Sequence, residues 1–412
     1  MDTADDHRRW RQLEGSLRTL SHAPWEEEDG YSPLVNEELR RIFALLRYAR
    51  ERDFLRRDRE RALHPYAQER DVSLRAYDRA LACLKRPQSP HQRLQVFYAL
   101  GLAYLHLGES KPAQETVDAA LDAATQLPDV AATAELMYLA GSLACSRGDY
   151  KASADYLTAA GRLLIQLGEE DDPADTALMI DALNIHALCL YTMQAYPAAW
   201  AALDKARRLV ARPPGDPLRA GSLALLAGLL HRWTGEPARA MQEVMAGAEA
   251  YAEWGVTRHH RLYLARLQRV TAECALDLAE GSSPRLTGFG RDAYLRIAHP
   301  AIEQALVIAK ETSDLSGEGM ALLVQARVER LRGEQTGRLD TIDSVLDCAE
   351  LLDDPALAIL ANTARGQELA ARNEREAALD AFQTADDVSL QYRVPVLGVM
   401  ARREVAKARE QE

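Results

Sequence analysis

The chain has 412 residues, of which 27% are charged and 6% are aromatic, and its formal net charge is −12. Nucleic acid and anionic membranes both need a positive protein surface, so this charge argues against a general affinity for either. No stretch approaches the ~18 uninterrupted apolar residues of a membrane span, and the opening residues MDTADDHRRW contain no apolar signal region. Five well-separated cysteines without a CxxC pair are typical of reduced core thiols. The sequence therefore predicts a cytoplasmic protein without a membrane partner.

Residues 1–90 are predicted to form an amino-terminal helical region. Its main feature is an arginine-rich helix over residues 34–62, followed by a helix over residues 65–84 that pairs with it as a divergent first repeat. Interleaved acidic residues three or four positions away favour a salt-bridged, solvated face. The alternative is that the arginines of residues 40–61 bind an acidic partner or nucleic acid. Nucleic acid is not expected to bind anywhere else on the chain. No helix-turn-helix pattern precedes Pro65, so a DNA-binding domain is not predicted.

The stretch from Leu94 to Ala120 predicts two amphipathic helices that fold back on each other at Gly108. If Leu94 is place 1, a small residue stands at place 8 and a helix-breaking residue at place 15. Small or apolar residues follow at places 20, 24 and 27. A small residue at place 8 lets the second helix approach the first closely.

This pattern recurs along the chain at a spacing of about 40 to 46 residues. Place 8 is occupied by Gly101, Gly141, Ala187, Gly228, Ala326 and Gly366, and place 15 by Gly108, Gly148, Gln194, Gly235, Gly333 and Asn373. The pattern resembles the tetratricopeptide repeat (TPR) family, with units longer than its usual ~34 residues. The resemblance implies an all-α, right-handed superhelical solenoid of antiparallel helix pairs. The repeats are expected over residues 91–393, with a capping helix over residues 394–412.

The fifth repeat contains an insertion at residues 281–290, with the sequence GSSPRLTGFG. A glycine-rich loop before a helix is also found in phosphate-binding sites. That interpretation is rejected here because no strand precedes the loop and the GxxxxGK[ST] motif is absent. Insertions in a solenoid lie in loops on one face, from which they can reach into the groove.

In TPR proteins the first helix of each pair lines the inner wall of the superhelix, where an extended peptide can lie. The resemblance carries this role to specific positions of the chain. An alternative is that some of these residues pack against a longer neighbouring helix. The Lys and Asn set of chaperone-tail carboxylate clamps is not reproduced. The predicted partner-binding residues are Gln95, Tyr98, His106, Tyr138, Asn184, Tyr191, Arg232, Trp233, Arg327 and Arg330.

The sequence contains no convincing catalytic or metal-binding motif. The side chains of the adjacent His259 and His260 point about 100° apart on a helix, and HExxH, GxSxG and Rossmann patterns are absent. We therefore expect no enzyme, cofactor or metal. An enzyme subunit using a pocket inside the superhelix is the weakest alternative.

The expected function is a non-catalytic scaffold that binds a protein or peptide in its groove. The main alternative is a ligand- or peptide-responsive regulator, similar to the TPR-containing peptide receptors of Gram-positive bacteria, with the arginine-rich helices as its output module. The sequence is compatible with a homodimer.

Overall fold

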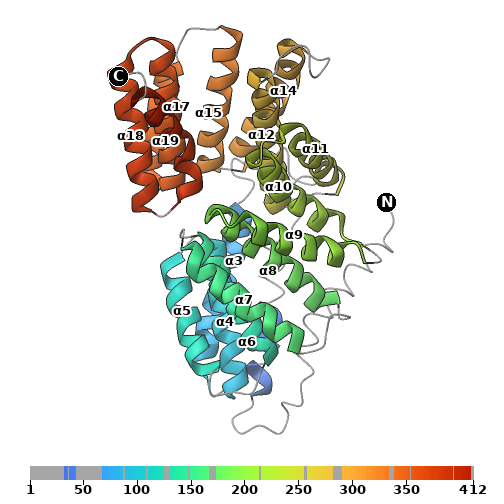
Figure 1. Ribbon diagram of the computed structural model, residues 1–412. Coiled ribbons are helices and arrows are strands. Elements are labelled where there is room, and N and C mark those ends of the chain that lie inside the picture. The colour runs from blue at the N-terminus through green and yellow to red at the C-terminus, as the bar shows by residue number, and fades with distance from the viewer. Residues whose placement is uncertain are drawn as a thin grey trace. The chain divides into compact units, whose positions relative to one another are not determined.

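The structure is a computed structural model that describes most of the chain from residue 67 onward. The described residues are 32–35, 37–42, 67–86, 89–107, 110–124, 130–146, 149–166, 173–212, 215–254, 258–281, 290–312, 314–333, 338–352, 354–392 and 394–409. These residues are helical apart from turns and short connections, and no strand occurs among them (Figure 1). Most of the predicted arginine-rich helix and residues 282–289 of the insertion lie outside them.

The chain forms two compact units, which divide within the predicted repeat region. The first comprises residues 1–189, 201–215 and 256–258, and the second comprises residues 190–200, 216–255 and 259–412. Helices α8 (Pro173–Thr192) and α9 (Tyr196–Val210) therefore each contribute to both units.

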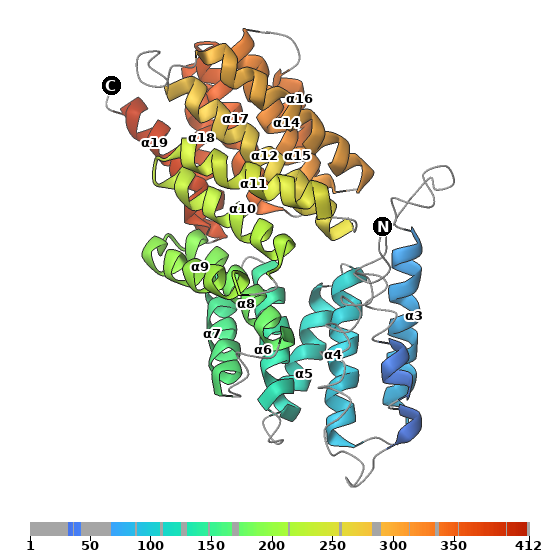
Figure 2. The same ribbon diagram turned by 90° about the vertical axis from the view of Figure 1, so that its right-hand side faces the viewer.

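The first unit is a row of antiparallel helices, each packed on the next. It contains α3 (Ala67–Leu84), α4 (Pro90–Leu107), α5 (Ser110–Ala124), α6 (Val130–Ser146) and α7 (Tyr150–Gln166). Figure 2 shows these helices side by side in chain order. Leu39 and Ile42 are buried against α3 and α4. Leu74 on α3 is exposed, because the small residues Ala76 and Ala80 form the buried side of this helix.

The second unit repeats the same arrangement. Its helices are α10 (Pro217–Trp233), α11 (Pro237–Trp254), α12 (Arg258–Gly281), α14 (Arg291–Glu311), α15 (Leu315–Arg332), α16 (Arg338–Leu352), α17 (Pro355–Ala371), α18 (Arg375–Gln391) and α19 (Pro395–Arg409). The last helix packs on α17 and α18. No described helix is long and apolar enough to cross a membrane.

The glycines at place 8 lie where paired helices approach each other closely. A Cβ atom added to Gly141 would lie 2.6 Å from Cγ of Leu157, and one added to Gly366 would lie 2.6 Å from Cε1 of Phe382. Each of these partners belongs to the second helix of the same pair. The packing role predicted for place 8 is confirmed.

The residues at place 15 make the turns within the helix pairs. Gly235 and Gly333 have φ angles of 80°, and Gln194 and Asn373 have φ angles of 63° and 62°. Such left-handed backbone ends a helix and reverses the chain sharply. The predicted turns are thus confirmed at these four positions, whereas Gly108 and Gly148 lie outside the described residues.

Candidate functional site

The predicted partner-binding residues of the first unit are mostly engaged in its packing. Gln95 is buried, and Tyr98 is half-buried against apolar residues of α3 to α6. Tyr138 and Asn184 are half-buried as well, and the side chain of His106 lies outside the described part of the chain. Gln95 and Tyr98 thus take part in packing, and their role in partner binding stays a prediction.

In the second unit, three predicted arginines meet around acidic residues of α12. Arg232, near the end of α10, donates from Nε to Oδ2 of Asp277 at 2.5 Å and from Nη1 to Oε2 of Glu273. These contacts join α10 to α12 close to the end of each helix. Both carboxylates lie on α12 four positions apart, so they share one face of that helix.

The same face of α12 also contacts α15, the first helix of the next pair. Arg327 donates from Nη2 to Oδ1 of Asp277 at 2.7 Å and to Oε2 of Glu280 at 2.6 Å. Asp277 is therefore shared by Arg232 and Arg327, which belong to different helices. Arg330, one turn along α15, donates to Oε1 of Glu280 at 3.3 Å and to Oε1 of Gln367 on α17 at 3.3 Å.

We call this set the arginine network. It comprises Arg232, Arg269, Glu273, Asp277, Glu280, Arg327, Arg330 and Gln367, and it extends over α10, α12, α15 and α17. Four guanidinium groups face three carboxylates, so one positive charge is in excess. The charged side chains are between 11% and 37% exposed, which makes the network partly accessible from solvent.

Mutual pairing decides the protonation of the carboxylates. Burial opposes ionisation of Glu273, but Arg269 and Arg232 outweigh burial and hold the pKa of this carboxyl below its usual range. Burial also opposes ionisation of Asp277 and Glu280, and the neighbouring arginines lower the pKa of both. All three are therefore ionised at neutral pH.

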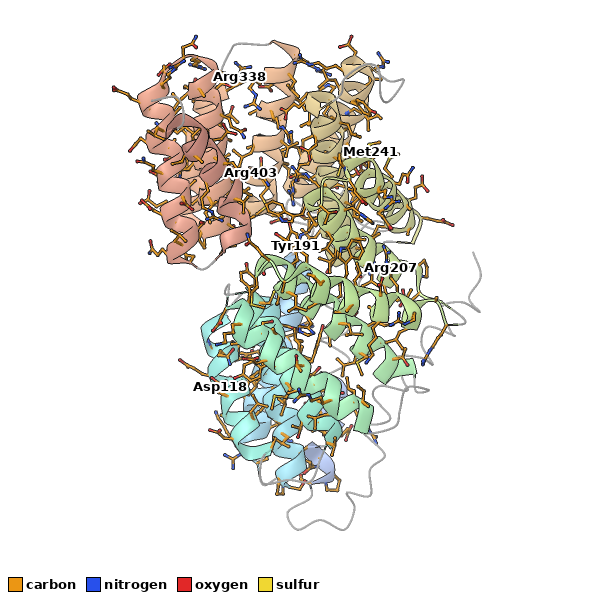
Figure 3. The ribbon with its side chains drawn as sticks, in the orientation of Figure 1. Asp118, Tyr191, Arg207, Met241, Arg338 and Arg403 are labelled. Carbon is orange, nitrogen blue, oxygen red and sulfur yellow. The ribbon has the colours of Figure 1, made fainter. Side chains whose placement is uncertain are left out.

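Aromatic side chains lie next to the arginine network. The ring centroid of Tyr196 is 6.2 Å from that of Tyr191 and 6.1 Å from that of Trp233, which follows Arg232 directly. Burial raises the pKa of each tyrosine to about 12. The hydroxyl of Tyr196 is buried without a hydrogen-bond partner among the described residues. The positive charge of Arg403 on α19 acts on Tyr196. Figure 3 labels Arg403 and Tyr191.

The structure thus brings together five predicted site residues, Tyr191, Arg232, Trp233, Arg327 and Arg330. Sequence reasoning missed Arg269, Glu273, Asp277, Glu280, Tyr196 and Gln367. The spacing of Glu273, Asp277 and Glu280, at i, i+4 and i+7, was the available signal, because it predicts an acidic stripe on one helix face. Arg269 and Glu273 are four positions apart, so a local i,i+4 pattern could have identified that pair. Arg232 and Arg327 are 41 to 50 residues from their carboxylate partners, so no local pattern could have identified those pairs.

The described residues offer no group of three or more His, Cys, Asp or Glu side chains that could hold a metal ion. The arginine network offers hydrogen-bond donors and charge, and the adjoining Tyr191, Tyr196 and Trp233 offer aromatic rings.

Comparison with known proteins identifies the fold. No protein-family model and no curated protein matches the sequence. Among solved structures, the apo form of RapI is similar with a TM-score of 0.54 and 12% identity, over 76% of this chain and 99% of that chain. The chain has a TPR-like fold. This confirms the predicted all-α architecture of antiparallel helix pairs.

Two further Rap structures cover more of the chain. A Rap protein complexed with Competence and Sporulation Factor has a TM-score of 0.54 and 11% identity, over 92% of this chain and 98% of that chain. The Rap conjugation gene regulator of plasmid pLS20, in complex with the Phr* peptide, has a TM-score of 0.55 and 12% identity, over 89% and 98%. At this identity the similarity is one of fold.

Proposed function

We propose that this chain is a non-catalytic protein that binds an extended peptide along the inner helices of its second unit, with the arginine network and the adjoining aromatic side chains as the binding surface. We place this activity in the cytoplasm, because the five well-separated cysteines are typical of reduced thiols. The observation that carries the proposal is that the network is continuous over α10, α12, α15 and α17 and remains partly exposed.

The side chains in the network suit a peptide ligand. Guanidinium and amide groups donate to peptide carbonyls and carboxylates, and tyrosine and tryptophan supply large apolar contacts at low conformational cost. The Phr* complex provides support at the level of fold, because a Rap protein binds a peptide on a similar solenoid.

The test is affinity selection with a pool of synthetic heptapeptides, with retained peptides identified by mass spectrometry. Arg232→Ala and Arg327→Ala would break paired charges and disturb the fold, so Trp233→Ala is the sharper variant.

We expect the full-length protein to retain a subset of the pool and Trp233→Ala to bind it about tenfold more weakly or worse, since buried aromatic anchors dominate interfaces. The matched control, Tyr392→Ala, alters an exposed aromatic residue at the end of α18 and should bind normally. Retention of no peptide, or equal retention by Trp233→Ala, would contradict the proposal.

A peptide-responsive regulator is the second candidate function. It is favoured by the structural similarity to the pLS20 regulator and by the arginines of residues 40–61 as a candidate output module. In this case the full-length protein should bind DNA or an acidic protein with an affinity that falls as salt rises and changes when peptide is added. Absence of binding to either partner, with and without peptide, would count against it.

A further inference from the structure

We infer that Arg330 and Gln367 form a subsite that binds a carboxylate of the peptide ligand. This inference rests on the proposed peptide-binding function and adds the chemical class of the group that is recognised. It concerns the end of the arginine network at which α15 meets α17.

The first argument is the hydrogen-bond inventory of Arg330. A guanidinium has five N–H donors. Arg330 uses only two of them within the described part of the chain, and both acceptors lie 3.3 Å away, beyond the usual range for strong charge-assisted bonds. By contrast, Arg327 makes bonds of 2.6 and 2.7 Å in the same network. Arg330 therefore has donors available, and its side chain is 22% exposed, so a ligand can reach it.

Gln367 supplies a second donor. Its side-chain oxygen accepts from Arg330, and its amide nitrogen has no acceptor among the described residues. One carboxylate can accept from a guanidinium and from an adjacent amide at the same time, because it has two oxygens with about four acceptor sites. The pair thus presents converging donors from two helices.

Charge favours an anion at this point. Burial disfavours the charged form of Arg330 and, together with the charge of Arg327, lowers its pKa even though Glu280 is nearby. Nearby negative charge therefore does not fully offset burial and the charge of Arg327 at Arg330. A bound carboxylate would add negative charge at this position.

The other acidic residue close to Arg330 does not fill this role. Glu368 adjoins Gln367, but its Oε1 accepts from Nη2 of Arg338 at 2.8 Å and from Nε of Arg372 at 3.1 Å. Its side chain is only 3% exposed, so these two arginines hold it within the fold. Glu368 is thus not available to the remaining donors of Arg330, which are open to a carboxylate of the peptide ligand.

The carboxylate could be the carboxyl terminus of the peptide or an Asp or Glu side chain, and three heptapeptide pools separate these sources. The first pool has free carboxyl termini and no Asp or Glu. The second is amidated and contains Asp and Glu, and the third is amidated and contains neither. Each pool is equilibrated with the full-length protein, and bound peptides are quantified by mass spectrometry.

We expect one or both carboxylate-bearing pools to be retained at least tenfold more than the third pool. Arg330→Gln should reduce this preference below about threefold, while the control Arg239→Gln, which changes a highly exposed arginine on α11, should leave it unchanged. Raising the salt concentration should reduce the preference of the wild-type protein, since screening weakens exposed charge pairs. If Arg330→Gln fails to fold, Gln367→Glu tests the same subsite, because an added negative charge should also abolish the preference.

Outcomes that overturn the inference differ from those that overturn the proposed function. Equal retention of all three pools, or an unchanged preference in Arg330→Gln, would reject the carboxylate subsite but leave peptide binding intact. Retention of no pool would reject both.

Discussion

At the scale of single residues, several carboxylates of the second unit join one helix to another. Asp277 accepts from Arg232 on α10 and from Arg327 on α15, and Glu368 on α17 accepts from Arg338 at the start of α16. A carboxylate shared in this way fixes the approach of one helix to another. Removing Glu368 would leave the buried guanidinium of Arg338 without this carboxylate.

Glu368 allows this effect to be measured. Glu368→Ala removes the partner of Arg338, whose side chain is only 8% exposed, so an unpaired charge remains buried. We expect the variant to lose about 3–5 kcal/mol of stability, the usual cost of breaking a buried pair. The measurement is urea denaturation followed by circular dichroism. Glu37→Ala, which breaks an exposed pair with Arg41, is the control and should change stability by less than about 1 kcal/mol. Equal small effects in both variants would show that the pair of Glu368 is not buried in solution.

At the scale of elements, a helix pair is defined by one close contact and one turn. Both depend on local sterics, so both can be tested by changing a single glycine.

A Gly→Ala substitution should have opposite effects on the melting temperature at two helical glycines, depending on how closely the neighbouring helix approaches. In Gly228→Ala the new Cβ would collide with Cγ1 of Val244, a fully buried β-branched side chain with little rotamer freedom. We expect a loss of about 1–3 kcal/mol from overpacking, seen as a lower melting temperature. In Gly161→Ala the nearest atom is Sδ of Met179 at 3.9 Å, so the higher helix propensity of Ala should raise the melting temperature. A rise in both variants would contradict the proposed closeness of α10 and α11.

The turns predict effects that arise from backbone conformation alone. Gly333 and Gln194 both have φ in the left-handed region, where a side chain costs roughly 1–2 kcal/mol. No atom lies within 4 Å of a Cβ added at Gly333, so Gly333→Ala should destabilise through the backbone only. Gln194→Gly should stabilise by relieving the same cost. Thermal melts of both variants check these signs, and Asn373→Gly should change little because Asn tolerates this conformation. A stabilising effect of Gly333→Ala would refute the argument.

These same features explain what the sequence could predict. Gly228 and Gly235 reveal a close contact and a turn through their own sterics, so a pattern of single residues was enough to establish the helix pairs. The ion pairs of Asp277 depend instead on how α12 is rotated relative to α10 and α15, which the spacing of small residues does not determine. Arg232 and Arg327 were therefore predicted to lie on a binding wall, while their carboxylate partners were missed.

At the scale of the whole molecule, the arginine network makes the stability of the second unit depend on pH. Its three carboxylates have pKa values below their ordinary values of 4.5 for Glu and 3.8 for Asp. Such groups stabilise the fold fully above the unfolded-state pKa, and this contribution is lost as pH falls through the lower, folded-state pKa. The contribution of these three carboxylates to stability should therefore be nearly constant between pH 6 and pH 8. It should fall in acid below about pH 4.

Asp277→Asn isolates this contribution, because the amide keeps the shape of the side chain but cannot ionise. At pH 7 the variant should melt well below the wild-type protein, since Arg232 and Arg327 both lose a charged acceptor. As the pH falls through the folded-state pKa of Asp277, the wild-type carboxylate is protonated too, so the difference between the two melting temperatures should shrink toward zero. Asp380→Asn, at an exposed position of α18, should match the wild-type protein at every pH. A difference that stays constant from pH 7 into acid would mean that Asp277 acts through packing, and the network would then not be the acid-sensitive element of this unit.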